Sequence, residues 1–506
     1  MRRPASDAQA AWLALAGVGS GALFILISAQ LSPFIAIAAL VGAIGFAVLV
    51  RNPVLGLYFT AAVVPLERMG RFVDDSSGIT ISLMRVIGLA ALGALVLNYV
   101  LRRKSFNINL PMLLFSGYSL IVFASMFRSE DFIGGARVFA SAMGHLLFFF
   151  LLINLTTTRK IALRLIVIWL LASGCAALYS GYDWHFGSGA DGGIGTAFDP
   201  GKGAQTTASR FSTVWEDRAE LESLDGLSLR RSMGPTSHAA VYGINLLMTL
   251  PFLLFCLKLP INWRLIWLSF GALGLTLYNV FLTNTRATIL LAGVVGLICV
   301  ARGLFKVTRP MLVAGAVGLL GLLVSLPADV YNRILDLSNY SVEKSASLRI
   351  RVDYVDAGLR AFADHPIFGI GTGNFHVIPQ YFRGSSVVPE ETSVHNEYLQ
   401  TLIEVGLLGS AFFFAFVFMI FRYAIRAGRI FSRYQDTQQE YWMMVACQIC
   451  MVSVLIFGLQ VDVFHFPLQG WWLVAGITCA MYRIAIDYEQ QQFMGRVAAA
   501  KGTEST

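Results

Sequence analysis

Long apolar runs recur along the whole chain, and they restrict its fold more than any other feature of the sequence. A helix needs about 20 mostly apolar residues to cross the hydrocarbon core of a bilayer. Runs of about that length occupy residues 11–29, 34–50, 82–101, 110–126, 138–155, 161–182, 238–257, 265–283, 286–301, 310–326, 402–421, 442–460 and 468–486. A shorter run at 54–65 is expected to cross or re-enter the membrane. This pattern predicts an all-α, polytopic integral membrane protein with about 12–14 transmembrane helices.

The composition excludes a soluble protein. Of the 506 residues, 56% are hydrophobic and only 13% are charged, whereas a soluble domain carries about 25% charged residues. The six cysteines lie in apolar segments, so no disulfide framework is expected. Cys447 and Cys450 form a C-x-x-C pair, which inside an apolar helix indicates packing rather than redox chemistry. The net charge of +8 does not indicate nucleic-acid binding, because the basic residues lie between the apolar runs.

The basic residues instead predict the orientation in the membrane. Connectors on the side of the N-terminus carry Arg51, Arg102, Arg103, Lys104, Arg159, Lys160, Lys258, Arg264, Arg302, Lys306, Arg309, Arg422, Arg426, Arg429 and Arg433. Short connectors on the other side carry Arg68, Arg71, Arg128 and Arg137. Because loops rich in Lys and Arg stay in the cytoplasm, both termini are expected there. Trp471 and Trp472 are expected in an aromatic belt at the membrane interface.

Two long polar segments divide the chain and face outward in this orientation. They are an external loop at 183–237 and a larger external, periplasmic loop at 327–401 that is expected to carry catalytic elements. We expect N-terminal transmembrane helices over 1–182, central ones over 238–326, and C-terminal ones with a cytoplasmic tail over 402–506.

The larger loop is expected to be partly helical. In SLRIRVDYVDAGLRAFA (347–363) apolar residues recur at helical spacing. A turn with Gly369, Gly371 and Gly373 follows. Because this turn follows a helix and lacks the P-loop lysine, we interpret it as a backbone turn rather than a nucleotide-binding loop.

Four stretches in fixed order resemble the O-antigen ligase and polymerase superfamily of bacterial envelope glycosyltransferases. They are RSMGPTSHAAVYG (231–243), NTRATILLAG (284–293), the loop stretch SLRIRVDYVDAGLRAFADHPIFGIGTGNF (347–375), and SVHNEYLQTLIEVGLLGS (393–410). The resemblance is strongest over residues 230–425. It implies a multi-pass protein of the bacterial cytoplasmic membrane.

The resemblance also implies an activity in surface polysaccharide assembly, of O-antigen or exopolysaccharide. A polyprenyl-pyrophosphate-linked glycan would be transferred to an acceptor hydroxyl at the outer face of the membrane, with inversion and without a metal or another cofactor. The chemistry of the outer face agrees, because that face has no ATP or sugar nucleotides and an activated donor must arrive in the bilayer. The expected partners are the lipid-linked donor, a lipid A core or lipid-linked glycan acceptor, and membrane lipids, with no nucleic acid.

The candidate donor-binding residues are arginines, since guanidinium groups stay charged and bind phosphate oxygens in pairs. Arg286 begins an apolar run, where a charge is costly and normally has a function or a partner. The residue pattern does not separate Arg349 from Arg351, because Arg349 could equally pair with Asp353. Arg231 belongs to the first of the four stretches.

His395 is the candidate general base, because a neutral imidazole can accept the proton of a sugar hydroxyl. A helix starting near residue 395 would hold it at the water–membrane boundary. Asn396, Asp462 and His238 are candidate supporting residues, and no His, Cys or Asp spacing indicates a metal site.

Other functions stay open at this point. A transporter, such as a flippase of a lipid-linked glycan, would also have many helices and buried arginines, but no internal repeat is evident and the polar candidates gather at one face. Among enzymes, the sequence does not separate a ligase from a polymerase or from a protein O-oligosaccharyltransferase, because all three share the donor.

Overall fold

The computed structural model describes most of the apolar part of the chain. The described residues are 33–66, 71–73, 80–186, 232–236, 239–260, 262–305, 317, 320–321, 346–374, 396–459 and 468–503. Within them the protein is all-α apart from a short antiparallel pair of strands, β1 (Arg71–Val73) and β2 (Thr80–Ser82). The predicted fold class is confirmed.

Most helices follow the apolar runs to within a few residues, but Glu397–Phe431 and Gln469–Thr503 extend well beyond the runs predicted at 402–421 and 468–486. The N-terminal part holds α2 (Pro33–Arg51), α3 (Pro53–Val63), α4 (Leu83–Leu101), α5 (Leu110–Met126), α6 (Phe132–Leu155) and α7 (Arg159–Phe186). The central part holds α10 (Ala239–Cys256), α11 (Trp263–Leu282) and α12 (Arg286–Ala301). The rest holds α15 (Ala346–Asp364), α16 (Glu397–Phe431), the 3-10 turn η5 (Gln435–Thr437), α17 (Gln438–Phe457) and α18 (Gln469–Thr503).

Seven helices of the described part are long and apolar enough to cross a membrane, or eight if one bent pair is a single span. That pair is Gly42–Arg51 with α3, bent by 115° as a broken span or re-entrant loop, which agrees with the expectation for the run at 54–65. Helices α5 and α12 are apolar but shorter. The predicted run at 11–29 lies outside the described residues, as does 310–326 apart from residues 317, 320 and 321.

Short polar residues set the starts of several helices. The side chains of Asn109, Asp131 and Asn262 accept hydrogen bonds from backbone N–H groups three residues later, at 3.0, 2.8 and 3.1 Å. Such caps satisfy N–H groups that have no partner inside the helix. In a membrane protein this fixes where the chain turns back toward the bilayer.

Helix α10 lies at the centre of the bundle and is buried on all sides. It packs between α17 and α11, while α16 packs along α5 and α18. Glycines allow the helices to approach closely: a Cβ on Gly476 of α18 would lie 2.5 Å from Leu152 of α6. Small residues at such contacts are typical of helix packing in membranes, where hydrophobic attraction between helices is weak.

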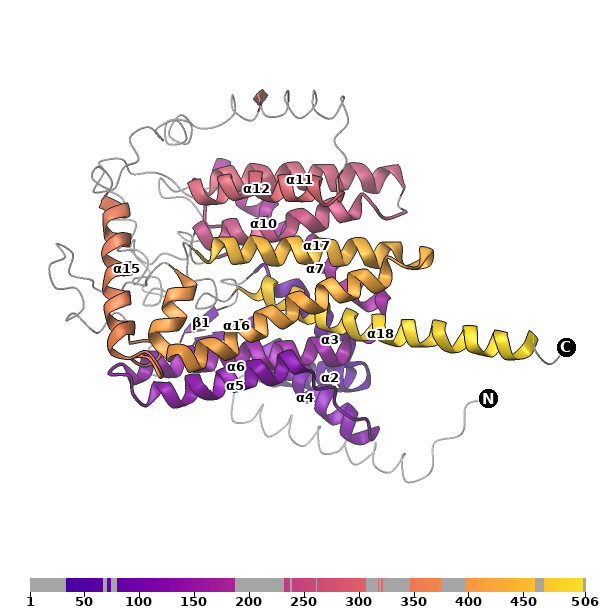
Figure 1. Cartoon of the computed structure of the whole chain (residues 1–506), viewed down its shortest axis with the longest axis horizontal. Helices are drawn as coiled ribbons and strands as arrows, with labels where there is room; N and C mark the ends of the chain where they lie inside the picture. Colours follow the sequence, from indigo (N-terminus) through magenta and orange to yellow (C-terminus); the bar gives the residue numbers. More distant parts are fainter. Residues whose placement is uncertain are drawn as a thin grey trace.

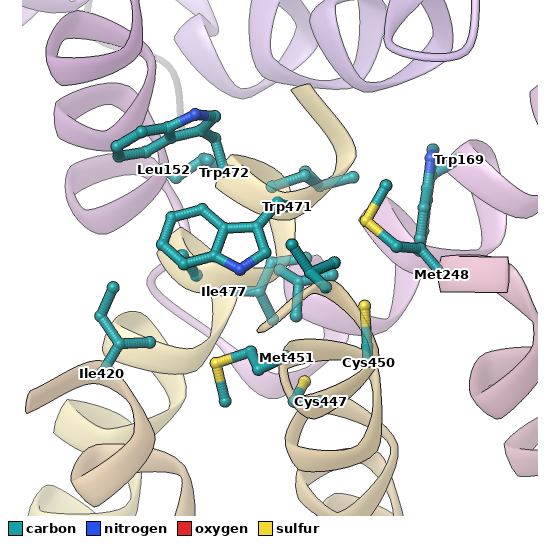
Figure 2. Close-up of a cluster of buried hydrophobic side chains, with 14 of the residues drawn as sticks. Leu152, Trp169, Met248, Ile420, Cys447, Cys450, Met451, Trp471, Trp472 and Ile477 are labelled. Atoms are coloured by element: carbon teal, nitrogen blue, oxygen red, sulfur yellow. The ribbon is translucent and has the colours of Figure 1, made fainter. Parts of the chain in front are cut away.

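An aromatic cluster joins four of these helices in the core. Trp472 of α18 stacks on His145 of α6 at 4.8 Å and lies 4.6 Å from Phe115 of α5 and 5.6 Å from Phe416 of α16, measured between ring centroids. Trp471 and Trp472 are each 1% exposed. Figure 2 shows the buried side chains that lie around them. The expected interfacial belt at these two residues is therefore wrong, because α5, α6, α16 and α17 surround the start of α18.

The C-x-x-C pair also lies in this core. Cys447 and Cys450 are free, fully buried cysteines of α17. They face Met451, Ile477 and Trp471 (Figure 2). Their role as packing residues is confirmed.

Helix α15 lies across one end of the bundle, roughly perpendicular to α10, α11, α12 and α17 (Figure 1). Its bounds agree with the predicted helix at 347–363. Tyr354, Ala357 and Ala361 pack against the first turns of α16 through Ile403 and Leu399. The C-terminal part of α18 extends beyond the opposite end of the bundle (Figure 1).

Candidate active site

Arg286 is the first residue of α12 and follows a strained turn. Asn284 adopts a left-handed conformation with φ of 48°, which asparagine tolerates better than most residues. The Nε atom of Arg286 is buried. A cation at this position opposes the helix dipole, whose N-terminal end is itself positive. The guanidinium and the N-terminal N–H groups therefore both favour an anion at the start of α12.

Two buried polar atoms lie beside Arg286. The Nδ2 atom of Asn284 and the Oγ1 atom of Thr288 have no hydrogen-bond partner in the described part of the chain. Gly243 of α10 lies close to Thr288, because a Cβ added to Gly243 would lie 2.6 Å from the side chain of Thr288. Buried polar atoms are rarely left unsatisfied, so the Asn284 amide favours a polar partner near Arg286, whereas the Thr288 hydroxyl is packed against α10. Neither residue is among the site residues predicted from the sequence, although both lie in the NTRAT stretch.

The segment Ser232–Thr236 is fixed beside the turn that precedes α12. The N–H group of Ser232 donates to the carbonyl of Leu282 at 2.9 Å, and its hydroxyl lies 2.7 Å from that of Ser180. Gly234, with φ of 51°, lies against the ring of Tyr242. The chain that follows Arg231 in the sequence thus lies at the same end of the bundle as Arg286.

The start of α16 is tied to the end of α17. Asn396 is the N-cap of α16, and its Oδ1 accepts from the N–H groups of Tyr398 and Leu399 at 3.1 and 3.0 Å. Its Nδ2 donates to the carbonyl of Leu459 at 3.2 Å, and the N–H of Glu397 donates to the carbonyl of Gly458 at 2.9 Å. Helix α16 therefore begins at Glu397, two residues later than the expected start near His395.

Helix α12 runs along α17 in the opposite direction, so its start also lies near the end of α17. Arg302, just after α12, donates to Gln448 in the middle of α17 at 2.7 Å. Gly303 lies against Trp442 near the start of α17. The start of α12, the end of α17 and the start of α16 consequently lie at the same end of the bundle, which α15 crosses (Figure 1).

A break in α16 receives the glycine-rich turn. Gly406 has φ of 65° and ψ of −169°, a conformation open essentially to glycine alone. The break exposes carbonyl groups of α16, and Ile370 and Gly371 donate to those of Ile403 and Glu404 at 2.9 and 3.2 Å. The N–H groups of the turn are thus used within the protein, and its interpretation as a backbone turn is confirmed.

The first turns of α16 also bury two acidic side chains. Glu397 is 0% exposed and Glu404 is 2% exposed. Gln400 donates to Glu404 at 2.6 Å, and the hydroxyl of Thr401 donates to the carbonyl of Glu397 at 2.8 Å. The burial of Glu397 could not be predicted from the sequence, because it depends on how α16 packs against α5 and α17.

The structure describes some of the predicted site residues and not others. Arg286 and Asn396 are described in full. Arg349 and Arg351 lie in the first two turns of α15, where the backbone alone is described. His395, Arg231, His238 and Asp462 lie outside the described residues. In the part of the chain that is described, no group of three or more His, Cys, Asp or Glu residues could hold a metal ion.

Part of the chain matches a known protein family. Residues 271–414 match the model of a family described as O-antigen ligase. The match includes Arg286, Arg349, Arg351, His395 and Asn396. No curated protein matches the chain. The resemblance noted in the sequence is confirmed.

Proposed function

The chain carries an O-antigen ligase family domain over residues 271–414, and we propose that it transfers a glycan from a polyprenyl pyrophosphate carrier to an acceptor hydroxyl. The domain supports an O-antigen ligase or polymerase type of activity in polysaccharide assembly, and the several apolar helices make it a multi-pass membrane protein. The transfer takes place at the outer face of the bacterial cytoplasmic membrane.

One observation carries the proposal: the matched segment brings the start of α12, where positive charge favours an anion, and the start of α16 at Asn396 and Glu397 to one end of the bundle. Arg286 begins α12, and Asn396 begins α16 where α17 ends. Because α15 crosses the same end, Arg349 and Arg351 belong to the helix that covers it. A pyrophosphate carries at least two negative charges, which arginines bind strongly.

Arg286 binds the pyrophosphate of the donor. Its guanidinium and the first N–H groups of α12 present positive charge to the same region. Arg231, Arg349 and Arg351 supply further charge to the phosphates. Developing negative charge on the leaving group is stabilised by the same groups, which lowers the barrier to breaking the sugar–phosphate bond.

His395 accepts the proton of the acceptor. The acceptor oxygen attacks the anomeric carbon of the donor sugar from the face opposite the phosphate, which inverts the configuration. The new bond is the glycosidic C–O bond, and the bond to the phosphate oxygen breaks to release polyprenyl pyrophosphate. The hydroxyl proton passes to the imidazole, a step that typically contributes a factor of about 10²–10⁴ to the rate. Asn396 holds the start of α16 through its cap, and Asp462 and His238 act as supporting groups.

Deletion of the gene, followed by analysis of the surface glycan, tests this function. Loss of long chains from the lipid A core, with lipid-linked polymer accumulating, is the result expected of a ligase. A product with a single repeat is expected of a polymerase, and loss of glycan from protein alone is expected of a protein O-oligosaccharyltransferase. An unchanged profile of all surface glycans in a deletion strain would contradict the proposal.

A further inference from the structure

The second half of α16 carries a pocket at the end of the bundle away from α15. Its volume is about 310 Å³, and it is lined by Phe418, Phe421, Arg422, Ile425, Arg426 and Arg429. Helix α16 rises about 1.5 Å per residue, so Arg426 lies about 30 Å along the helix from the break at Gly406. That length equals the thickness of the hydrocarbon core. The pocket therefore lies at the opposite membrane surface from the candidate active site.

Three arginines of this pocket have no anionic partner in the described part of the chain. Arg422, Arg426 and Arg429 are exposed, and no ion pair or hydrogen bond joins their guanidinium groups to any residue that the structure describes. Like charges four residues apart destabilise a helix, as Arg422 and Arg426 do here. Such a cluster is stabilised by a bound anion.

Some other basic residues at the same end do have partners. Arg159 pairs with Glu440 at 3.4 Å, and Arg433 pairs with Glu489. Arg302 donates to Gln448, and Arg483 donates to the carbonyl of Thr156. Exposed arginines outside the pocket, such as Arg51 and Arg164, also have no side-chain partner among the described residues. The pocket is therefore distinguished by the three arginines that α16 gathers beside an apolar wall, and not by the absence of acceptors alone.

The remaining wall of the pocket is apolar and faces outward. Phe418 is 63% exposed, and Phe421 and Ile425 are partly exposed. Exposed phenylalanine on a membrane-spanning helix contacts acyl chains, and the arginines one to three turns further on reach the headgroup level. The pocket therefore combines an anion site with an acyl-chain site.

We propose that this pocket binds an anionic glycerophospholipid of the adjacent leaflet. The phosphate binds between Arg422, Arg426 and Arg429, and the first part of an acyl chain lies against Phe418 and Ile425. A free phosphate would not use the apolar wall, and a zwitterionic lipid offers a cation that the arginines repel. This binding is independent of the proposed transfer reaction, because it lies at the other end of α16.

Lipid titration of the full-length purified protein, followed by native mass spectrometry, tests the site. The probes are phosphatidylglycerol, phosphatidylcholine and inorganic pyrophosphate. Each basic residue near an anionic surface contributes about a factor of five to binding, so replacing all three arginines (R422Q, R426Q and R429Q) should weaken phosphatidylglycerol binding about a hundredfold. The matched control removes three exposed arginines outside the pocket (R51Q, R102Q and R164Q) and should retain the tight binding.

Three outcomes would overturn the proposal. They are equal phosphatidylglycerol affinity of the pocket variant and the control, phosphatidylcholine binding as tight as that of phosphatidylglycerol, and pyrophosphate binding to the same arginines as tightly as the lipid. If the pocket variant does not fold, a measurement on the unmodified protein still tests the site. A photoactivatable phosphatidylglycerol should label the peptide that contains Phe418–Arg429, and labelling confined to other peptides would refute the site.

Discussion

Arg286 stands where the dipole of α12 opposes a positive charge, beside buried polar atoms of Asn284 and Thr288. A positive charge at the start of a helix is unfavourable toward the helix dipole, and a bound anion would relieve this repulsion. At the scale of single residues, this arrangement is the strongest support for a phosphate site at this end of the bundle.

Replacing Arg286 by alanine should reduce glycan transfer about a hundredfold or more, because each lost charge-assisted hydrogen bond contributes about 1.5–3 kcal/mol. Lysine should restore activity in part, because its ammonium group is a point charge, whereas a guanidinium group can donate two hydrogen bonds to one phosphate. The measurement is transfer by purified protein with lipid-linked donor. Arg264→Ala, an exposed arginine at the other end of α11, is the control and should keep its activity. Full activity in Arg286→Ala would reduce this residue to a membrane anchor.

Single residues also show where prediction from sequence reached its limit. The position of Arg286 at the start of α12 could be predicted, because the apolar run begins there. The burial of Trp471 and Trp472 could not, since a pair of tryptophans near the end of a run is typical of an interface. The difference depends on which helices surround α18, and this information is not local in the sequence.

At the scale of helices, most bounds could be predicted from the apolar runs. Helices α5 and α12 have the predicted ends, because a capping asparagine and the NTR turn mark them. The break of α16 at Gly406 was not predicted, because a single glycine in an apolar run is compatible with a continuous helix. The glycine-rich turn at 369–373 was the available signal, since its residues Ile370 and Gly371 supply N–H groups to the carbonyls at the break.

Gly406→Ala should lower the stability of the protein by about 2 kcal/mol or more, because its backbone conformation is open essentially to glycine alone. A Cβ there would also lie 2.3 Å from the carbonyl oxygen of Ile367. The measurement is Tm in detergent. Gly174→Ala in α7 is the matched control, because nothing lies within 4 Å of the added carbon. The control should be neutral or more stable by up to about 1 kcal/mol. Equal Tm values of the two variants would contradict this account of the break.

At the scale of the whole molecule, the basic residues separate the two ends of the bundle. Arg422, Arg426 and Arg429 lie at one end, and the candidate active site lies at the other. From the positive-inside rule we propose that the basic end lies in the cytoplasm. We also propose that both termini are cytoplasmic and that the two external loops divide the chain.

Reporter fusions test this orientation. Fusions after Lys104 and after Arg433 should report a cytoplasmic location, and fusions within 190–230 and 330–390 should report an external one. The reporters are alkaline phosphatase, which is active outside, and a fluorescent protein, which is active inside. An external location of the fusion after Arg433 would reverse the whole assignment and place the arginine pocket outside.

Transfer by the purified protein tests the central claim most directly. Wild-type protein in lipid nanodiscs receives a polyprenyl-pyrophosphate-linked glycan and a lipid-linked or lipid A core acceptor, and glycosylated acceptor and released polyprenyl pyrophosphate are measured together. We predict equal amounts of both products, and a rate lower by roughly two to four orders of magnitude in His395→Ala, the range for loss of a general base. His395→Gln, which keeps a hydrogen-bonding group but is no base, should be as slow. Near-normal turnover in the Gln variant, or no transfer by the wild type with either acceptor, would contradict the account.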